Sequence, residues 1–158
     1  MKVENKIRVI SFNVAKNFLL VDSLLNLCVN EFDIIFLQEP AWQTIRMAPS
    51  TVSREGDEVV GAPRHPQWQM MVRPPPPGEN PRVMAYVSTR LAALRPAMRR
   101  DLVDHRDLLL VSLFGRGQTF NFLNVYNDAD GTACTFLEER EMPLPLVYQP
   151  MLSVSCFK

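Results

Sequence analysis

A strand–helix–strand pattern near the N-terminus constrains the fold of this chain more than any other feature. The alternating, β-branched run Ile7–Asn13 is typical of a β-strand. Residues Asn17–Asn30 place apolar side chains at the i, i+3, i+4, i+7 spacing of an amphipathic helix. Asp33–Gln38 is a short, nearly continuous apolar run, typical of a strand buried on both faces. This order predicts a βαβ unit with a right-handed crossover and two parallel strands.

Beyond Pro40 the pattern predicts a different arrangement. No periodicity is visible over Ala41–Asn80, which we therefore expect to form a long loop. Strand patterns then return at Arg82–Ser88, His105–Phe114 and Gln118–Tyr126, and Thr132–Glu139 could open a helix. The glycines of Gly115–Gly117 predict a tight hairpin between the last two strands. The order favours an α+β domain that opens with a βαβ unit and continues with antiparallel strands.

Composition excludes several classes of protein. A chain of 158 residues has room for about one domain. Its 17 basic and 17 acidic side chains cancel, so no bulk positive field indicates nucleic-acid binding. Three cysteines at no metal-ligand spacing indicate free thiols in a reducing compartment, and hence an intracellular protein of the nucleus or cytoplasm. No apolar run approaches the length of a membrane span, so we expect no membrane partner.

Two polar side chains stand at the ends of the two predicted parallel strands. Asn13 ends the first strand, and Glu39 directly follows the second. Because the carboxyl ends of parallel strands meet at one edge of a sheet, the two side chains should converge there. A carboxylate beside an amide oxygen suits Mg²⁺. Strand-end capping explains the same pair without any metal, and spacing alone does not separate the two interpretations.

Three motifs carry a resemblance to a known family. FNV near the start, FDIIFLQEPAW and LNVYN resemble the endonuclease/exonuclease/phosphatase superfamily, and within it the endonuclease-like domains of fungal LINE-type retrotransposons. The resemblance runs from about Ile7 to about Leu137. We therefore divide the chain into a partial domain over residues 1–139 and an unassigned tail over residues 140–158.

The resemblance implies a fold, a reaction and a set of residues. The family fold is an α/β sandwich with two packed sheets, of which this chain would hold the N-terminal part. Its members hydrolyse phosphodiester or phosphomonoester bonds with Mg²⁺ or Mn²⁺, which here implies DNA or RNA as partner. By the same resemblance, Glu39 binds the metal and Asn13 arranges the metal and phosphate. Tyr126 contacts the scissile phosphate, with Asn127 beside it.

Two of the family's motifs are missing. The chain has neither the Gly-Asp-x-Asn motif nor the Ser-Asp-His motif, no Asp follows Asp130, and no His follows His105. We therefore expect turnover near background, because each positioned acid–base group contributes about 10²–10⁴ in rate. We also expect the second sheet to be largely absent, leaving the first with exposed apolar surface and unpaired edges. Asp104 and His105 could replace the missing groups, but a surface charge cluster explains them better.

Weaker signals support two alternative functions. An Arg-rich loop with aromatic residues could make the chain a non-catalytic nucleic-acid-binding remnant; its members would be Trp42, Arg46, Arg64, Trp68 and Arg73. The run Pro74–Pro77 favours polyproline II, as a ligand of an SH3-type domain or as a stiff surface loop. His65 is interpreted as a solvated loop residue. The tail beyond residue 139 fits no family element, which suggests a truncated or misread reading frame.

Overall fold

The computed structural model describes residues 6–126 together with 133, 136, 137, 139, 146 and 147. The first of its two main sheets has the strand order β1-β2-β6-β5. Its strands are β1 (Val9–Asn13), β2 (Ile34–Gln38), β5 (Trp68–Val72) and β6 (Val83–Ser88). Strands β1 and β2 are parallel, and β6 runs antiparallel to both β2 and β5. The βαβ prediction is thus confirmed in its parallel pair.

The second sheet has the order β10-β9-β8-β7. Its strands are β7 (Ala97–Met98), β8 (Leu108–Phe114), β9 (Thr119–Val125) and β10 (Leu146–Val147). The predicted hairpin is β8–β9, and the turn between them uses a positive φ of 75° at Gly117, where a residue with a side chain would be strained. The 3₁₀ helix η1 (Thr89–Leu94) connects the two sheets.

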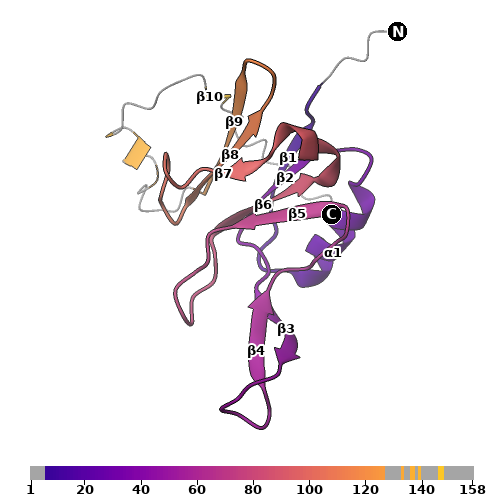
Figure 1. The fold of residues 1–158 in the computed structure, drawn as a ribbon, viewed down its shortest axis with the longest axis vertical. Coiled ribbons are helices and arrows are strands. Elements are labelled where there is room, and N and C mark those ends of the chain that lie inside the picture. Colours follow the sequence, from indigo (N-terminus) through magenta and orange to yellow (C-terminus); the bar gives the residue numbers. More distant parts are fainter. Residues whose placement is uncertain (1–5, 127–132, 134–135, 138, 140–145, 148–158) are drawn as a thin grey trace.

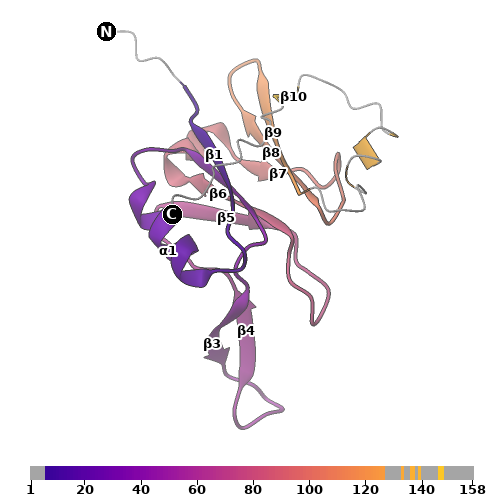
Figure 2. The same ribbon diagram turned by 180° about the vertical axis from the view of Figure 1, so that it is seen from behind.

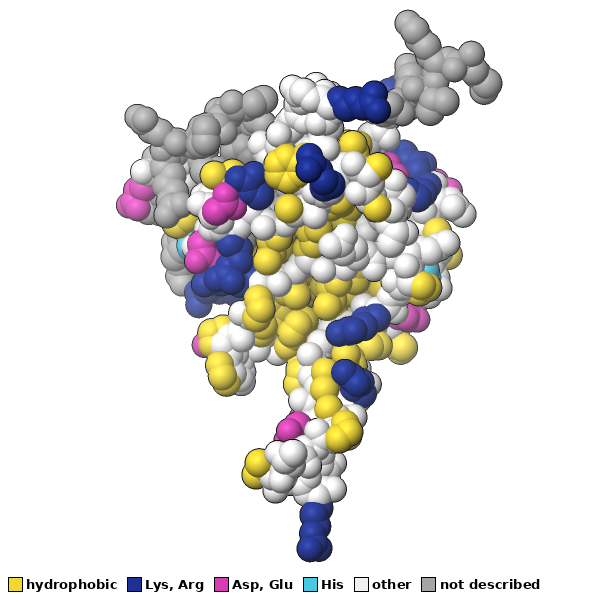
Figure 3. Space-filling model, in the orientation of Figure 1, with side chains coloured by type: hydrophobic (Ala, Val, Ile, Leu, Met, Phe, Trp, Pro, Cys, Tyr) yellow, Lys and Arg dark blue, Asp and Glu magenta, His cyan; other side chains and the backbone are white. Residues whose placement is uncertain are grey.

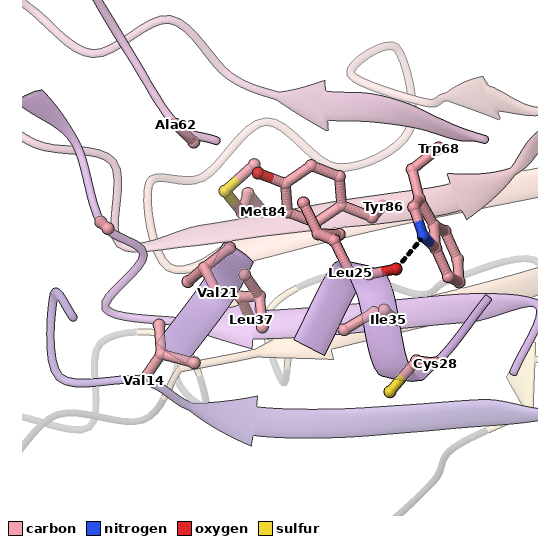
Figure 4. Packing of buried hydrophobic residues seen from close by; sticks show 11 residues of the cluster. Val14, Val21, Leu25, Cys28, Ile35, Leu37, Ala62, Trp68, Met84 and Tyr86 are labelled. Carbon is pink, nitrogen blue, oxygen red and sulfur yellow. Dashed lines mark hydrogen bonds between the residues drawn. The ribbon is translucent and has the colours of Figure 1, made fainter. Parts of the chain in front are cut away.

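The helix α1 (Phe18–Leu27) covers the outer face of the first sheet (Figure 1). It starts where the side chain of Asn17 accepts a hydrogen bond from the amide of Leu20, a common N-cap. Val21, Leu25 and Cys28 point into the cluster that Figure 4 shows. There the indole nitrogen of Trp68 donates to the carbonyl of Leu25 over 2.9 Å, so β5 is tied to the helix as well as packed against it.

The first sheet lies between α1 and the second sheet in both views (Figures 1 and 2). Apolar side chains of the two sheets interdigitate between them; the buried ones are Ile34, Phe36, Met71, Val83, Ala85, Val87, Leu109, Val111 and Leu113. On the outer face of the second sheet, Leu108, Leu110 and Leu123 pack with Ala133, Phe136 and Leu137. The chain therefore has the α+β order that the pattern predicts and the two packed sheets that the resemblance implies.

One expectation about this sandwich is wrong. We expected the second sheet to be largely absent and the inner face of the first sheet to be exposed. Strands β7, β8 and β9 instead cover that face, and Ile34, Val87 and Val111 are fully buried there. Exposed apolar surface remains on α1, where Leu19 and Leu27 are about three-quarters exposed, at 77% and 75%.

The segment Ala41–Asn80 is also not the loop that we expected. It contains β5 of the first sheet and a separate two-stranded ribbon of β3 (Gln43–Ala48) and β4 (Asp57–Gly61). The ribbon projects away from the sandwich (Figure 1). Most of its side chains are exposed, so no face is buried enough to impose an alternating pattern.

Within the part of the chain that the structure describes, no helix is long and apolar enough to cross a membrane.

Candidate active site

The ends of three strands meet at one edge of the sandwich. Asn13 is the last residue of β1, Glu39 directly follows β2, and Tyr126 directly follows β9. The hydroxyl of Tyr126 donates a hydrogen bond to Oε1 of Glu39 over 2.9 Å, although 87 residues separate them. Asn13 pairs in register with Gln38, the neighbour of Glu39. Three of the four predicted site residues therefore lie together, whereas Asn127 falls outside the described residues.

A buried amide pair holds together the two strands that carry Glu39 and Tyr126. Gln38 and Asn124 are each 2% exposed, and Nε2 of Gln38 donates to Oδ1 of Asn124 over 2.6 Å. Asn124 in turn donates to the carbonyls of Leu37 and Met84 over 3.0 and 3.1 Å. Gln38 also donates to the hydroxyl of Ser11 over 2.8 Å. These bonds link β9 to β1, β2 and β6 immediately beneath the site.

The backbone around Glu39 has an unusual conformation. Glu39, Ala15 and Lys16 have φ angles of 47°, 46° and 59°, a region that residues with a side chain seldom adopt. The amide of Lys16 donates to the carbonyl of Glu39 over 2.8 Å, and Oδ1 of Asn13 accepts from the amide of Ala15 over 3.0 Å. Because left-handed residues cost about 1–3 kcal/mol each and cluster at functional sites, the surrounding bonds must stabilise this geometry.

Glu39 and Tyr126 line an open depression of about 420 Å³. Its other lining residues come from the β1–α1 loop and from the loop before β6; they are Lys16, Gly78, Glu79, Asn80, Pro81 and Arg82. Two carboxylates and two cationic side chains therefore line the same depression. A site of this charge pattern can hold a cation and an anion next to each other.

Arg82 occupies a fixed position in this depression. Its Nε lies 2.9 Å from Oδ1 of Asp107, whose side chain is fully buried. Its guanidinium carbon lies 4.6 Å from the centre of the Tyr126 ring, within the range of a cation–π contact. The amide of Tyr126 donates to the carbonyl of Asp107 over 2.8 Å. The contacts run from the buried Asp107 through Arg82 and Tyr126 to Glu39.

The donor set fits a hard divalent cation. Glu39 and Glu79 supply two carboxylates in the lining of the depression. Asn13, at the end of the neighbouring strand β1, offers an amide oxygen that also accepts from the amide of Ala15. Mg²⁺ typically takes one or two carboxylates and completes its shell with water and substrate phosphate. The described residues contain no group of three or more His, Cys, Asp or Glu side chains placed to hold a metal by themselves. The oxygens present suit Mg²⁺ or Mn²⁺ bound together with a phosphate.

Asp104 and His105 do not form the substitute dyad. Asp104 forms ion pairs with Arg73 and Arg100 at 3.3 and 3.2 Å. Nδ1 of His105 accepts from the amide of Asp107 over 3.1 Å, and its ring lies 5.0 Å from that of Phe136. Neither residue is among the described residues that line the depression. The interpretation of this stretch as a charge cluster is confirmed, except that Asp107 is buried within it.

The Arg-rich aromatic loop is not a continuous nucleic-acid surface. Trp68 is buried in β5 and its indole bonds to the helix, while Arg73 is paired with Asp104. Arg64 and the partly buried His65 line a second, largely apolar depression with Trp68. Figure 3 shows apolar side chains gathered on this face between β5 and the β3–β4 ribbon. Arg46 lies in β3 and Trp68 in β5, so the five residues do not belong to the single loop that we expected.

Sequence reasoning missed the cationic half of the site. Lys16 and Arg82 carry no motif of their own, and Asp107 belongs by sequence to the charge cluster around Asp104. The available signal was positional: Lys16 follows the end of β1, and Arg82 immediately precedes β6, the partner of β2. The pairing of β2 with β6 sets Arg82 opposite Glu39, and the amide of Glu39 donates to the carbonyl of Arg82 over 2.9 Å. This pairing between strands, and not the sequence pattern, brings the cationic side chains to Glu39.

Comparison with known proteins yields a structural likeness only. No protein-family model matches the chain, and no curated protein matches it. Among solved structures, the chain is similar to the endonuclease domain of TRAS1, a telomere-specific non-LTR retrotransposon, with 16% sequence identity and a TM-score of 0.50. The match covers 85% of this chain and 50% of that one, so the chain spans about half the length of its neighbour. The fold of this chain is thus an endonuclease-like α+β fold.

Proposed function

We propose that this chain binds the phosphodiester backbone of nucleic acid together with Mg²⁺ or Mn²⁺ at the Glu39 site. The class of reaction is metal-dependent phosphodiester hydrolysis, with turnover near background for this chain alone. The 2.9 Å contact between Tyr126 and Glu39 carries the proposal, because it joins a carboxylate and a phenol donor from opposite sheets. The endonuclease-like fold supports the same class of substrate.

Each side chain has a defined task in this proposal. Glu39 and the amide oxygen of Asn13 would hold the metal, which supplies Lewis-acid polarisation of the phosphoryl group when bound. Tyr126 donates a hydrogen bond through its hydroxyl, so it can stabilise negative charge that develops on a phosphate oxygen. Glu39 and Tyr126 already lie within hydrogen-bond reach, so a phosphate can engage both after small rotations.

We expect low turnover because the described lining of the depression contains no histidine. The two histidines of the chain are His65 and His105, and neither belongs to its described lining. A general acid or base for the attacking water and the leaving oxygen would have to come from elsewhere, and each such group typically contributes about 10²–10⁴ in rate. Binding with little hydrolysis is the expected behaviour of the chain alone.

The test combines a binding assay with a nicking assay on the wild type and Glu39→Ala. We expect Mg²⁺ to strengthen binding of a labelled DNA duplex to the wild type and to have no effect on Glu39→Ala. Supercoiled plasmid should stay intact with both proteins. Equal Mg²⁺ dependence in the two proteins would refute the site. Mg²⁺-dependent nicking that Glu39→Ala abolishes would refute the low turnover and direct attention to Glu79 as the base.

A further inference from the structure

The depression holds a second feature that a metal site by itself does not require. Arg82 is held between a fully buried carboxylate, that of Asp107, and the face of the Tyr126 ring. Long cationic side chains on a surface normally keep their rotamer freedom, and fixing one costs free energy. An arginine held on two sides at the wall of a depression is therefore preorganised for a ligand.

The charges around the depression indicate which ligand this is. Lys16 and Arg82 contribute two positive charges and Glu39 and Glu79 two negative charges, so the lining is neutral as a whole. A divalent cation at Glu39 would give the lining a net charge of about +2, which the carboxylate of Asp107 behind Arg82 lowers to about +1 and an anion can neutralise. The planar guanidinium of arginine matches a phosphate through two parallel hydrogen bonds.

We infer that Arg82 and Lys16 form a phosphate subsite that binds a backbone phosphate of nucleic acid, and that Asp107 is its positioning residue. This inference rests on the proposed function, since it assigns the phosphate that the Glu39 site would act on. Asp107 fixes the Nε end of the Arg82 guanidinium over 2.9 Å and lies too deep to meet the ligand. Its second ion pair, with Arg106 at 3.8 Å, is to a side chain outside the described lining of the depression, so Asp107 reaches the ligand through Arg82.

The test needs variants that fold. Arg82→Gln by itself would take one cationic partner from a fully buried carboxylate, which destabilises proteins strongly. The double variant Arg82→Gln/Asp107→Asn removes both charges together and keeps two groups that can hydrogen-bond. Arg82→Lys keeps the charge without the planar fork. Arg54→Gln is the matched control, since Arg54 lies in the loop of the projecting β3–β4 ribbon (Figure 1).

Binding is measured by fluorescence anisotropy with a labelled DNA duplex in Mg²⁺, and by calorimetry with Mg²⁺ alone. We expect the double variant to bind DNA about ten- to a hundredfold more weakly, the loss typical of a charge-assisted hydrogen-bond pair. Arg82→Lys should fall between the double variant and the wild type, and Arg54→Gln should match the wild type. Asp107→Asn should weaken binding by itself, but by no more than the double variant does, because a residue that acts by positioning Arg82 cannot cost more than the loss of Arg82.

The outcomes separate this inference from the proposed function. If the double variant is folded and binds DNA as the wild type does, the phosphate subsite is refuted, whatever happens to Mg²⁺. If Arg82 variants lose DNA binding while the wild type binds no Mg²⁺, the subsite is supported and the metal-dependent function is refuted. A loss of DNA binding from Asp107→Asn that exceeds the loss in the double variant would refute the positioning role.

Discussion

Replacement of the buried amide beneath the site should destabilise the whole sandwich. Asn124 is 2% exposed and makes three side-chain hydrogen bonds, two as donor to Leu37 and Met84 and one as acceptor from Gln38. A buried hydrogen bond contributes about 0.5–1.5 kcal/mol net, so Asn124→Ala should lower the free energy of unfolding by about 2–4 kcal/mol. Gln38 retains Ser11 as a partner, which keeps the loss below that of an isolated buried amide.

The assay is urea unfolding followed by far-ultraviolet circular dichroism. The matched control is Asn26→Ala, because Asn26 is an exposed residue of α1 whose side-chain amide donates to the carbonyl of Asp22 within the helix. That control should change the free energy of unfolding by less than about 0.5 kcal/mol. A loss below about 1 kcal/mol for Asn124→Ala, with an unchanged slope against urea, would refute the view that this amide ties the sheets together.

Three further predictions test other parts of the account. Tyr126→Phe keeps the ring but removes the hydroxyl, so DNA affinity in Mg²⁺ should fall about three- to tenfold; anisotropy titrations with unchanged affinity would argue against its contact with phosphate. Leu19→Glu/Leu27→Glu replaces two exposed apolar side chains of α1 and should reduce self-association without loss of stability; light scattering that still rises with concentration to the same extent would contradict this. Burial, followed by the negative charge of Glu31, raises the pKa of the Cys28 thiol, so less thiolate exists at pH 8 than in the unfolded chain. With the other two cysteines replaced by serine, Cys28 should therefore react with iodoacetamide much more slowly in the native state than in urea, and equal rates would count against its burial.

The elements with a strong local pattern could be predicted from the sequence. The β1–α1–β2 unit was predicted because a helical stripe and an apolar run each report burial, and the β8–β9 hairpin because its turn needs glycine at a positive φ. The helix proved shorter than the pattern, since its cap lies at Asn17 and it ends at Leu27. Local signals of this kind do not depend on which strands become neighbours.

The strands β3, β4 and β5, which the sequence pattern does not predict, lack such local signals. In β5, Trp68 and Met71 are both buried although they are three residues apart, so the strand shows no alternation. The ribbon of β3 and β4 has little buried surface on either side. Both segments lie near prolines, and for this reason their sequences resemble those of loops.

Some residues of the candidate site could likewise be predicted from the sequence, and others could not. The resemblance assigned separate site roles to Glu39, Asn13 and Tyr126, and the structure places the three residues at one edge. Arg82 and Asp107 could not be predicted, because their contact joins the start of β6 to the residue before β8 and depends on how the two sheets stack. Pairings between sheets leave no periodic trace in a single sequence.

The most direct test of the central claim is calorimetric titration of the folded protein with Mg²⁺, comparing the wild type with Glu39→Gln. Glutamine keeps the size and hydrogen-bonding capacity of the side chain but removes the charge that would hold the metal. We predict saturable binding of one Mg²⁺ by the wild type and its loss in Glu39→Gln, with circular dichroism unchanged. Binding that survives the substitution, or a wild type that binds no Mg²⁺, would contradict the assignment of Glu39 as a metal ligand.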